Sequence, residues 1–365
     1  MRQQLIESRE DLEAFWPEMS STEVLAIDTE FFRVKTYYPK FCLLQVYARE
    51  VIYCIDPLAL DLNTDDFREV LRAQDKTRIF HAARQDIEVL YGCCKEVPRT
   101  VFDTQVAAAM LGLGDQIGYA NLVEIVTGKS LTKAHTRTDW CQRPLSPEQI
   151  DYAIDDVRYL EEIYNYLGAG LEKCGRLQWV LEECMELSDV SLYDTDPKVA
   201  YQRIEHGQAL EPTAQSVLKE LAIWRERTSQ QLDLPRNWVV KDKVLESMAQ
   251  VKPDSPGKLS AVEGVSSKFV RRFGEEVLQL IRDVAYQDHH PVVWPKEQPL
   301  SADQRALQKQ ILDCLRRIAK ESGISPSLLG SRHDVAGLVR GRRDVNLKSG
   351  WRAQLLGSEL DALLA

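Results

Sequence analysis

Two acidic side chains stand two residues apart at the end of an apolar run. Residues 24–28 read Val-Leu-Ala-Ile-Asp and predict a short buried strand, and Glu30 follows Asp28 with Thr29 between them. Alternate residues of an extended segment point to the same side, so both carboxylates can face one point. Because open α/β sheets bind ligands at the carboxyl ends of their strands, the pair is a candidate site. A strand end that is merely acidic has the same pattern.

A third acid follows a different strand. Asp86 comes five residues after the expected strand 78–81, near the start of a helix expected at 84–93. An acid in the first turn can stabilise the helix by its interaction with the helix dipole and have no other role. It can also reach a ligand bound at the neighbouring strand end. Both roles stay open.

A longer helix expected at 146–167 adds two pairs of polar residues. Tyr152 and Asp156 are four residues apart and share a face. Asp151 and Asp155 form a second pair with the same spacing, rotated by about 100° around the helix. Spacing does not choose between the two pairs.

Four carboxylates and one phenol can therefore come from three separate elements. Four carboxylates buried around one point would be prohibitively unstable without cations. Two divalent cations balance four negative charges, and oxygen-only ligands select hard ions such as Mg²⁺ or Mn²⁺ over zinc. Two such ions can clamp the attacking and leaving oxygens of a phosphodiester. The pattern therefore favours two-metal hydrolysis of a phosphate ester.

The elements that would position these residues alternate along about the first 170 residues. Strands are expected at 24–28, 41–48, 51–55, 78–81 and 100–104, with a hairpin joining the second and third. Helices are expected at 9–19, 66–74, 84–93, 104–113, 121–126 and 146–167. Ser146, Pro147 and Gln149 give the last helix a capped start. We predict an α/β domain with a mixed sheet flanked by helices.

Strand signals nearly vanish after about residue 171. The remainder is expected to contain a helix at 171–194, a boundary at 194–212, and a helical stretch at 213–285 that is broken at 234–236 and at 253–257. A proline-rich linker at 288–299 and more helices from Ser301 are expected to follow. Arg225 lies ten residues before Pro235, and Arg316 lies ten before Pro326. This hint of repetition suggests two diverged copies of one small helical domain.

Composition excludes several classes of protein. At 365 residues and 44% apolar residues, the chain suits a globular protein of two or three domains. No apolar run approaches the roughly 20 residues that span a bilayer, and the charged N-terminal segment does not suit a signal peptide. The eight cysteines form no C-x-x-C pair and are typical of reduced thiols. We expect a cytoplasmic protein that does not bind membranes.

Charge is unevenly distributed between the two halves. Residues 1–195 carry a net charge of −14 and residues 196–365 carry +4. The C-terminal segment places several cations around Trp351: Arg340, Arg342, Arg343, Lys348 and Arg352. Basic residues beside an aromatic ring suit contact with a nucleic-acid backbone and base. A solvated helical surface is the alternative interpretation, and the positive net charge of this half modestly favours binding.

The motifs together resemble a known family. Asp28-Thr-Glu30, His81-x4-Asp86 and Tyr152-x3-Asp156 look like the three motifs of DEDD-superfamily 3′–5′ exonucleases, in the branch that carries a tyrosine. Segments 28–46 and 138–160 are similar to ribonuclease D. Residues 213–288 resemble an HRDC domain, and residues 300–365 do so more weakly.

The resemblance implies a fold and an organisation into domains. It implies a ribonuclease H-like exonuclease domain at 1–195, followed by all-α HRDC-like domains at 211–288 and 297–365. It also implies hydrolytic removal of nucleotides from RNA 3′ ends and trimming of structured RNA such as tRNA precursors. A DNA exonuclease and a non-catalytic RNA-binding scaffold are the alternatives.

The resemblance also assigns roles within the site. It selects Tyr152 and Asp156 over Asp151 and Asp155. By this likeness two Mg²⁺ or Mn²⁺ ions are bound by Asp28, Glu30, Asp86 and Asp156. Tyr152 would then orient the attacking water.

Substrate contacts are expected next to the acids. Thr29 and Phe31 are candidates for holding the terminal nucleotide, with Phe31 available for stacking on a base or for packing. His81 is a candidate phosphate contact or a structural histidine. Arg137 is a candidate phosphate contact, whereas Trp140 is expected in the core.

Overall fold

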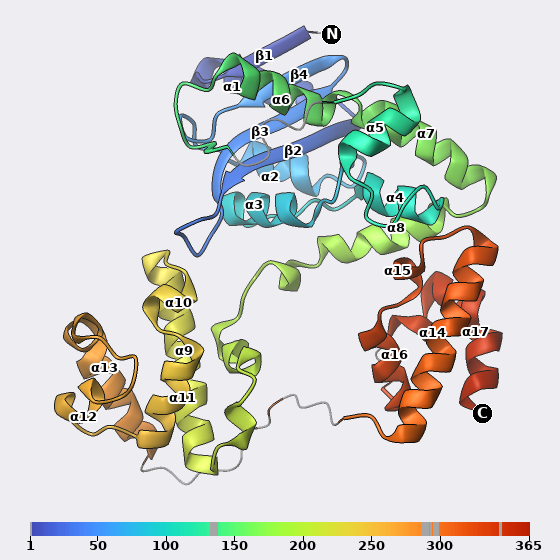
Figure 1. The fold of residues 1–365 in the computed structure, drawn as a ribbon. Coiled ribbons are helices and arrows are strands. Elements are labelled where there is room, and N and C mark those ends of the chain that lie inside the picture. The colour runs from blue at the N-terminus through green and yellow to red at the C-terminus, as the bar shows by residue number, and fades with distance from the viewer. Residues whose placement is uncertain (1, 132–137, 286–291, 293, 295–298, 343–344) are drawn as a thin grey trace. The chain divides into compact units, whose positions relative to one another are not determined.

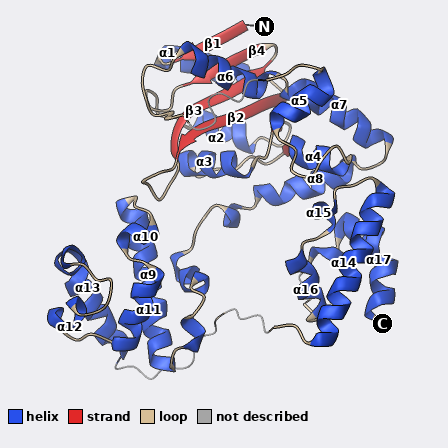
Figure 2. Ribbon diagram, viewed as in Figure 1, coloured by secondary structure: helices blue, strands red, loops and turns tan. Residues whose placement is uncertain are grey.

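The computed structural model describes residues 2–131, 138–285, 292, 294, 299–342 and 345–365 (Figures 1 and 2). The chain forms two compact units. The first unit comprises Met1–Phe32, Lys40–Tyr193 and Pro299–Ala365, and the second comprises Arg33–Pro39 and Asp194–Gln298. None of the helices described has the length and apolar character needed to cross a membrane.

A six-stranded mixed sheet forms the base of the first unit. Its order is β1-β4-β3-β2-β5-β6, and β3 runs antiparallel to both neighbours while the other pairs are parallel. The strands are β1 (Arg2–Ile6), β2 (Val24–Phe32), β3 (Lys40–Ala48), β4 (Val51–Ile55), β5 (Thr77–Phe80) and β6 (Val101–Asp103). The predicted mixed sheet is confirmed. Its hairpin turns at Arg49 and Glu50, both with positive φ, as a two-residue turn requires.

Helices lie on both faces of this sheet. They are α1 (Arg9–Ser20), α2 (Asp65–Arg72), α3 (Arg84–Cys94), α4 (Thr104–Met110), α5 (Tyr119–Thr127), α6 (Pro147–Arg158), α7 (Leu160–Lys173) and α8 (Leu177–Met185). In Figure 1, α6 and α3 lie on opposite sides of the sheet. Ser146 and Gln149 form the capping box predicted at the start of α6. After α8 the chain continues in short 3₁₀ turns rather than the helix expected to residue 194.

The single helix expected at 146–167 is divided in two at Tyr159. The Tyr119 hydroxyl donates to the carbonyl of Asp155 at 2.9 Å and accepts from the Tyr159 N–H at 3.2 Å. In an uninterrupted helix that N–H would pair with that carbonyl directly. A side chain inserted into the backbone ladder breaks or bends a helix, which corrects the expectation. Helix α6 therefore ends two residues after Asp156.

The C-terminal helices pack within the first unit. They are α14 (Ala302–Ser322), α15 (Pro326–Leu329), α16 (Arg332–Val339) and α17 (Gly350–Leu364). Trp351 is fully buried and stacks on Trp179 of α8, with ring centroids 5.2 Å apart. Arg352 pairs with Glu183 of the same helix at 2.7 Å, and Trp351 Nε1–H also donates to Glu183.

These contacts correct the interpretation of the C-terminal segment as an RNA-stacking surface. Trp351 and Arg352 serve internal packing, because their partners lie within the same unit. Lys348 pairs with Asp361 at 2.7 Å. Arg343 lies outside the described residues.

The second unit is a small helical domain. Its helices are η3 (Pro197–Arg203), α9 (Pro212–Leu232), α10 (Arg236–Val239), α11 (Asp242–Val251), α12 (Pro256–Ser260) and α13 (Ser267–Ala285). Both α9 and α14 have 21 residues and are followed by a four-residue helix, in line with the repetition seen in the sequence. Buried Arg225 pairs with Asp242 at 2.6 Å, whereas Arg316 is exposed.

Part of the expected linker belongs to this domain. Trp294 is 8% exposed, donates to the carbonyl of Ile204 at 3.1 Å, and packs edge-on to Tyr201. The described part of 288–299 is therefore not a free spacer, because a tryptophan anchors it in the core. Within this segment the structure describes only Val292, Trp294 and Pro299, and the other residues lie outside the described part.

Candidate active site

The alternation of side chains along β2 separates its polar residues onto two sides. Asp28 and Glu30 point toward Asp156 of α6, and one carboxylate oxygen from each of the three lies within 4.8 Å of the others. Thr29, between them, points toward Asp86 of α3. The two sides of β2 thus contact acids from two helices, Asp156 of α6 on one side and Asp86 of α3 on the other.

Thr29 fixes the fourth acid. Its backbone N–H and its hydroxyl both donate to Oδ1 of Asp86, at 3.1 and 2.6 Å. Both residues are buried. The Thr29 hydroxyl therefore orients Asp86, and the contact expected between Thr29 and the terminal nucleotide stays a prediction.

The starts of both site helices are held by polar contacts. The Asp103 carboxylate accepts from the backbone N–H groups of Ala82 and Ala83, at 3.0 and 2.8 Å, at the beginning of α3. Arg143, in the segment before α6, donates to Asp56 at the end of β4, with one contact of 2.8 Å. These contacts fix how the two helices meet the strand ends.

Burial and mutual repulsion raise the pKa of every acid in the cluster. Burial is the largest cause, followed by neighbouring carboxylates, and together they raise the pKa of Glu30 to about 10 and that of Asp156 to about 7. The pKa values of Asp28 and Asp86 are also well above their ordinary range, for the same reasons. Among the described residues, the charged groups that contribute most to these pKa shifts are all carboxylates. An oxygen-only site without a cation of its own fits divalent metal ions.

The structure also distinguishes the two pairs on α6. The Tyr152 hydroxyl hydrogen-bonds to Asp156, which belongs to the cluster. Asp155 instead pairs with Arg158 at 2.7 Å, and Asp151 is exposed. The structure thus places Asp156 in the acid cluster and Asp155 in an ion pair, and the metal-binding role of Asp156 stays a prediction.

The remaining candidates lie in different settings. His81 has both ring nitrogens engaged, with Thr104 Oγ1 and the carbonyl of Ile117, each at 2.9 Å. These contacts favour the structural role over a phosphate contact. Phe31 is half-buried on β2, after a register shift that follows Glu30. Arg137 lies outside the described residues.

Trp140 and Tyr119 complete the surroundings of α6. Trp140 is 2% exposed, as expected for a core residue, and its ring lies 6.0 Å from that of Tyr152. The sequence reasoning missed Tyr119, which sets the end of α6, and Arg143, which sets its beginning. Their partners are 36 and 87 residues away, so local patterns carried no signal for them.

Comparison with known proteins defines the class. The 3′-5′ exonuclease family model matches residues 3–172, and the HRDC domain model matches residues 214–281. The α/β unit with its acid cluster and the helical domain thus correspond to a 3′–5′ exonuclease joined to an HRDC domain.

Relatives that match nearly the whole chain identify the family of exonucleases to which it belongs. Ribonuclease D of Bartonella henselae is 30% identical and covers 99% of this chain and 89% of its own length. Ribonuclease D of Granulibacter bethesdensis is 35% identical, and the match covers 98% of this chain and 92% of the length of that relative. The crystal structure of Escherichia coli RNase D, described as an exoribonuclease involved in structured RNA processing, matches with a TM-score of 0.88 and 31% identity, covering 100% of this chain and 99% of that one. The chain belongs to the ribonuclease D family and is a 3′–5′ exoribonuclease hydrolase.

Proposed function

We propose that the first unit hydrolyses RNA from its 3′ end with two divalent metal ions and releases nucleoside 5′-monophosphates. The observation that carries this proposal is the convergence of Asp28, Glu30 and Asp156 within 4.8 Å, with Asp86 held beside them by Thr29. Hydrolysis adds water at phosphorus and breaks the bond to the 3′ oxygen of the preceding nucleotide. The released nucleotide therefore keeps its 5′ phosphate.

The four acids would hold the ions, and neighbouring groups would position the reactants. Bound Mg²⁺ or Mn²⁺ would supply the positive charge that stabilises the attacking and leaving oxygens. The Tyr152 hydroxyl, hydrogen-bonded to Asp156, is suited to hold a water near the cluster. Thr29 keeps Asp86 in place, and Phe31 is available to the base of the terminal nucleotide.

We infer that the substrates are structured RNAs, among them tRNA precursors that need 3′ trimming. The support is the similarity over nearly the whole chain to ribonuclease D relatives, including the helical domains. We also propose that the enzyme acts in the cytoplasm. All eight cysteines are free thiols, which suits a reducing compartment.

The test compares RNA and DNA of the same sequence. We expect release of nucleoside monophosphates from 3′-labelled RNA only when Mg²⁺ or Mn²⁺ is present, and much slower release from DNA. Asp156→Asn should abolish the release, and Asp151→Asn, an exposed change on the same helix, should not. Faster release from DNA would favour a DNA exonuclease. Binding without hydrolysis under every metal condition would favour a scaffold.

A further inference from the structure

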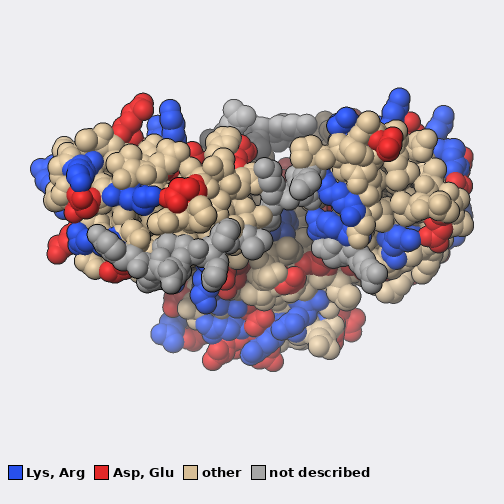
Figure 3. All heavy atoms as spheres, turned by 90° about the horizontal axis from the view of Figure 1, so that it is seen from below, with Lys and Arg blue, Asp and Glu red and all other residues tan. Residues whose placement is uncertain are grey.

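Two cysteine side chains from distant parts of the first unit are in contact. Cys42 lies in β3, and Cys141 lies five residues before Ser146, the N-cap of α6. Their sulfur atoms are 2.9 Å apart. The two sulfurs of a disulfide bond are about 2.05 Å apart, so a shift of about 1 Å would bring these thiols to bonding distance. On the face drawn in Figure 3, by contrast, basic and acidic side chains are interspersed, so charge alone marks no further site there.

Backbone contacts hold both thiols in place. The Arg143 guanidinium donates to the carbonyl of Cys42 at 2.6 Å and to the carboxylate of Asp56 at 2.8 Å. The backbone N–H of Cys141 donates to Asp139 Oδ1 at 2.9 Å, which fixes the turn that leads to Arg143. Because the backbone is held on both sides, the contact between the sulfurs is set by the fold and not by two freely rotating side chains.

The two thiols differ in their access to solvent. Cys42 is fully buried, whereas Cys141 is half-buried. Burial raises the pKa of the Cys42 thiol, and the neighbouring Cys141 raises it further, so Cys42 stays protonated at neutral pH. A small oxidant dissolved in water therefore reaches Cys141 first, and the sulfur of Cys42 lies beside it to react with the product.

We propose that Cys42 and Cys141 are a modification site, which forms a reversible disulfide bond when the protein is exposed to hydrogen peroxide. The peroxide transfers one oxygen atom to the Cys141 thiol, which becomes a sulfenic acid, and the peroxide is itself reduced to water. The Cys42 sulfur then attacks the Cys141 sulfur, so that the S–S bond forms, the S–O bond breaks, and the hydroxyl leaves with the Cys42 proton as water. Two molecules of a small thiol restore both cysteines by exchange and are oxidised to their own disulfide. In a reducing compartment the bond therefore lasts only while oxidant is present.

The bond joins two elements that hold the acid cluster. The register of β2 against β3 shifts after Glu30, and Cys42 is the extra residue of this bulge. Cys141 precedes α6, which carries Asp156. The carboxylates of Glu30 and Asp156 repel each other when no metal is bound. A disulfide at this place therefore ties α6 to the sheet where the charges of the site oppose their contact.

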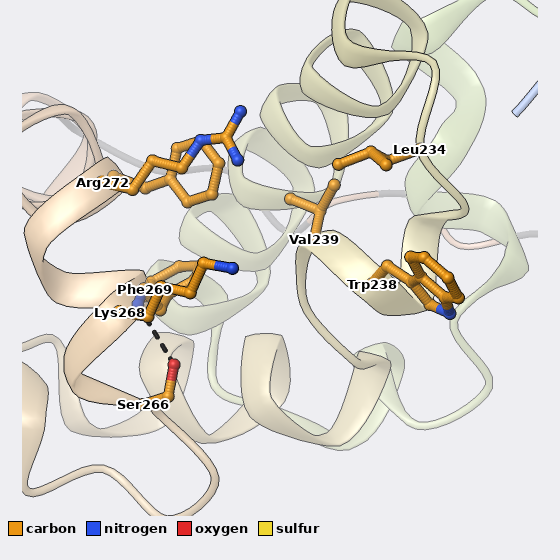
Figure 4. A pocket seen from close by; sticks show the side chains of 8 residues that line it. Leu234, Trp238, Val239, Ser266, Lys268, Phe269 and Arg272 are labelled. Carbon is orange, nitrogen blue, oxygen red and sulfur yellow. Dashed lines mark hydrogen bonds between the residues drawn. The ribbon is translucent and has the colours of Figure 1, made fainter. Parts of the chain in front are cut away.

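The cross-link should stabilise the first unit and leave the second unchanged. Cys42 and Cys141 are 99 residues apart in sequence, and a bond that closes so long a loop strongly restricts the unfolded chain. We expect oxidation to raise the unfolding midpoint of the metal-free protein by roughly 10 °C. Residues 194–298 contain no cysteine, so the reaction does not reach the cavity between α10 and α13 (Figure 4). RNA cleavage with Mg²⁺ should therefore continue at the normal rate.

The test treats the reduced full-length protein with one equivalent of hydrogen peroxide. Mass spectrometry should show the loss of two hydrogen atoms and a cross-link between the peptides that contain Cys42 and Cys141, and dithiothreitol should reverse both changes. Cys141→Ser, a change at a half-buried position, should prevent the cross-link. Cys42→Ala should instead leave a sulfenic acid at Cys141, which dimedone labels. The matched control is Cys174→Ser, which removes an exposed thiol of the same unit and should leave the cross-link unchanged.

Two results would overturn the proposal. The first is a wild-type protein in which Cys141, after peroxide treatment, is still a thiol or a sulfenic acid that dimedone labels, because the two sulfurs then do not bond. The second is a cross-linked protein that unfolds in EDTA at or below the midpoint of the reduced form, or that cleaves RNA more slowly, because the bond then does not preserve the site. The cross-link is detected by mass, so its absence is distinct from a failure to hydrolyse RNA, which would overturn only the proposed function.

Discussion

Asp156→Asn should stabilise the metal-free protein although it abolishes hydrolysis. The carboxyl of Asp156 is partly buried among other acids, and its pKa rises from an ordinary value of 3.8 to about 7. A group whose pKa is raised by folding contributes stability at low pH that is lost as the pH rises through the folded value. The asparagine has no charge to bury, and its side-chain oxygen can still accept the hydrogen bond from Tyr152.

The pKa difference sets the size of the effect. Removing this charge should stabilise the metal-free fold by about 4 kcal/mol at pH 8, by about 2 kcal/mol at pH 5, and very little below pH 4. For a unit of this size, 4 kcal/mol corresponds to roughly 10 °C in the unfolding midpoint. Glu30 adds to the effect in the same direction, because Asp156 is one of the charges that raise its pKa.

The assay is thermal unfolding in EDTA at pH 5 and pH 8, repeated with Mg²⁺. Mg²⁺ should stabilise the wild type more at pH 8 than at pH 5, and it should stabilise Asp156→Asn much less. Asp151→Asn serves as the control, since this residue is exposed on the same helix. A midpoint for Asp156→Asn at pH 8 that equals or falls below that of the wild type in EDTA would refute the reasoning.

Three further predictions concern catalysis and packing. Tyr152→Phe should lower turnover roughly 10²-fold with little change in RNA affinity, and intact turnover with weaker binding would make Tyr152 a substrate contact instead. A 3′-phosphate should block degradation because it adds negative charge beside Glu30, whereas a 5′-phosphate should not, and cleavage of circular RNA would contradict end binding. Trp351→Ala should destabilise the first unit by about 3–5 kcal/mol in urea unfolding, since the ring is fully buried, and unchanged stability with weaker RNA binding would restore the surface interpretation.

The parts of the site that could be predicted depend on local patterns. Asp28 and Glu30 follow from strand alternation, and the start of α6 follows from Ser146 and Gln149. The choice of Asp156 over Asp155 needed either the family resemblance or the fold. Only the three-dimensional contacts show which carboxylate joins the cluster and which pairs with Arg158.

The parts that could not be predicted depend on contacts between distant residues. Tyr119 divides the expected helix through a single hydroxyl, and no periodicity in the sequence reports such an insertion. The C-terminal segment looked like a binding surface because basic residues surround Trp351. Its partner Glu183 lies 168 residues earlier, so no local pattern indicates that the ring is buried. The edge strand β1 was missed because Arg-Gln-Gln-Leu-Ile has too few apolar residues to stand out.

The stacking of Trp351 on Trp179 has a consequence for synthesis of the protein on the ribosome. The first unit is discontinuous in sequence, since all of 194–298 is translated before the helices that cover α8. Helix α8 therefore leaves the ribosome with Trp179 uncovered, and the ring stays uncovered until α17 has emerged. Domains tend to fold in the order in which they are synthesised. The second unit can therefore finish folding before α17 of the first unit has been made. A nascent chain that is released before α17 is made would carry an exposed aromatic face on α8, which chaperones and proteases can recognise.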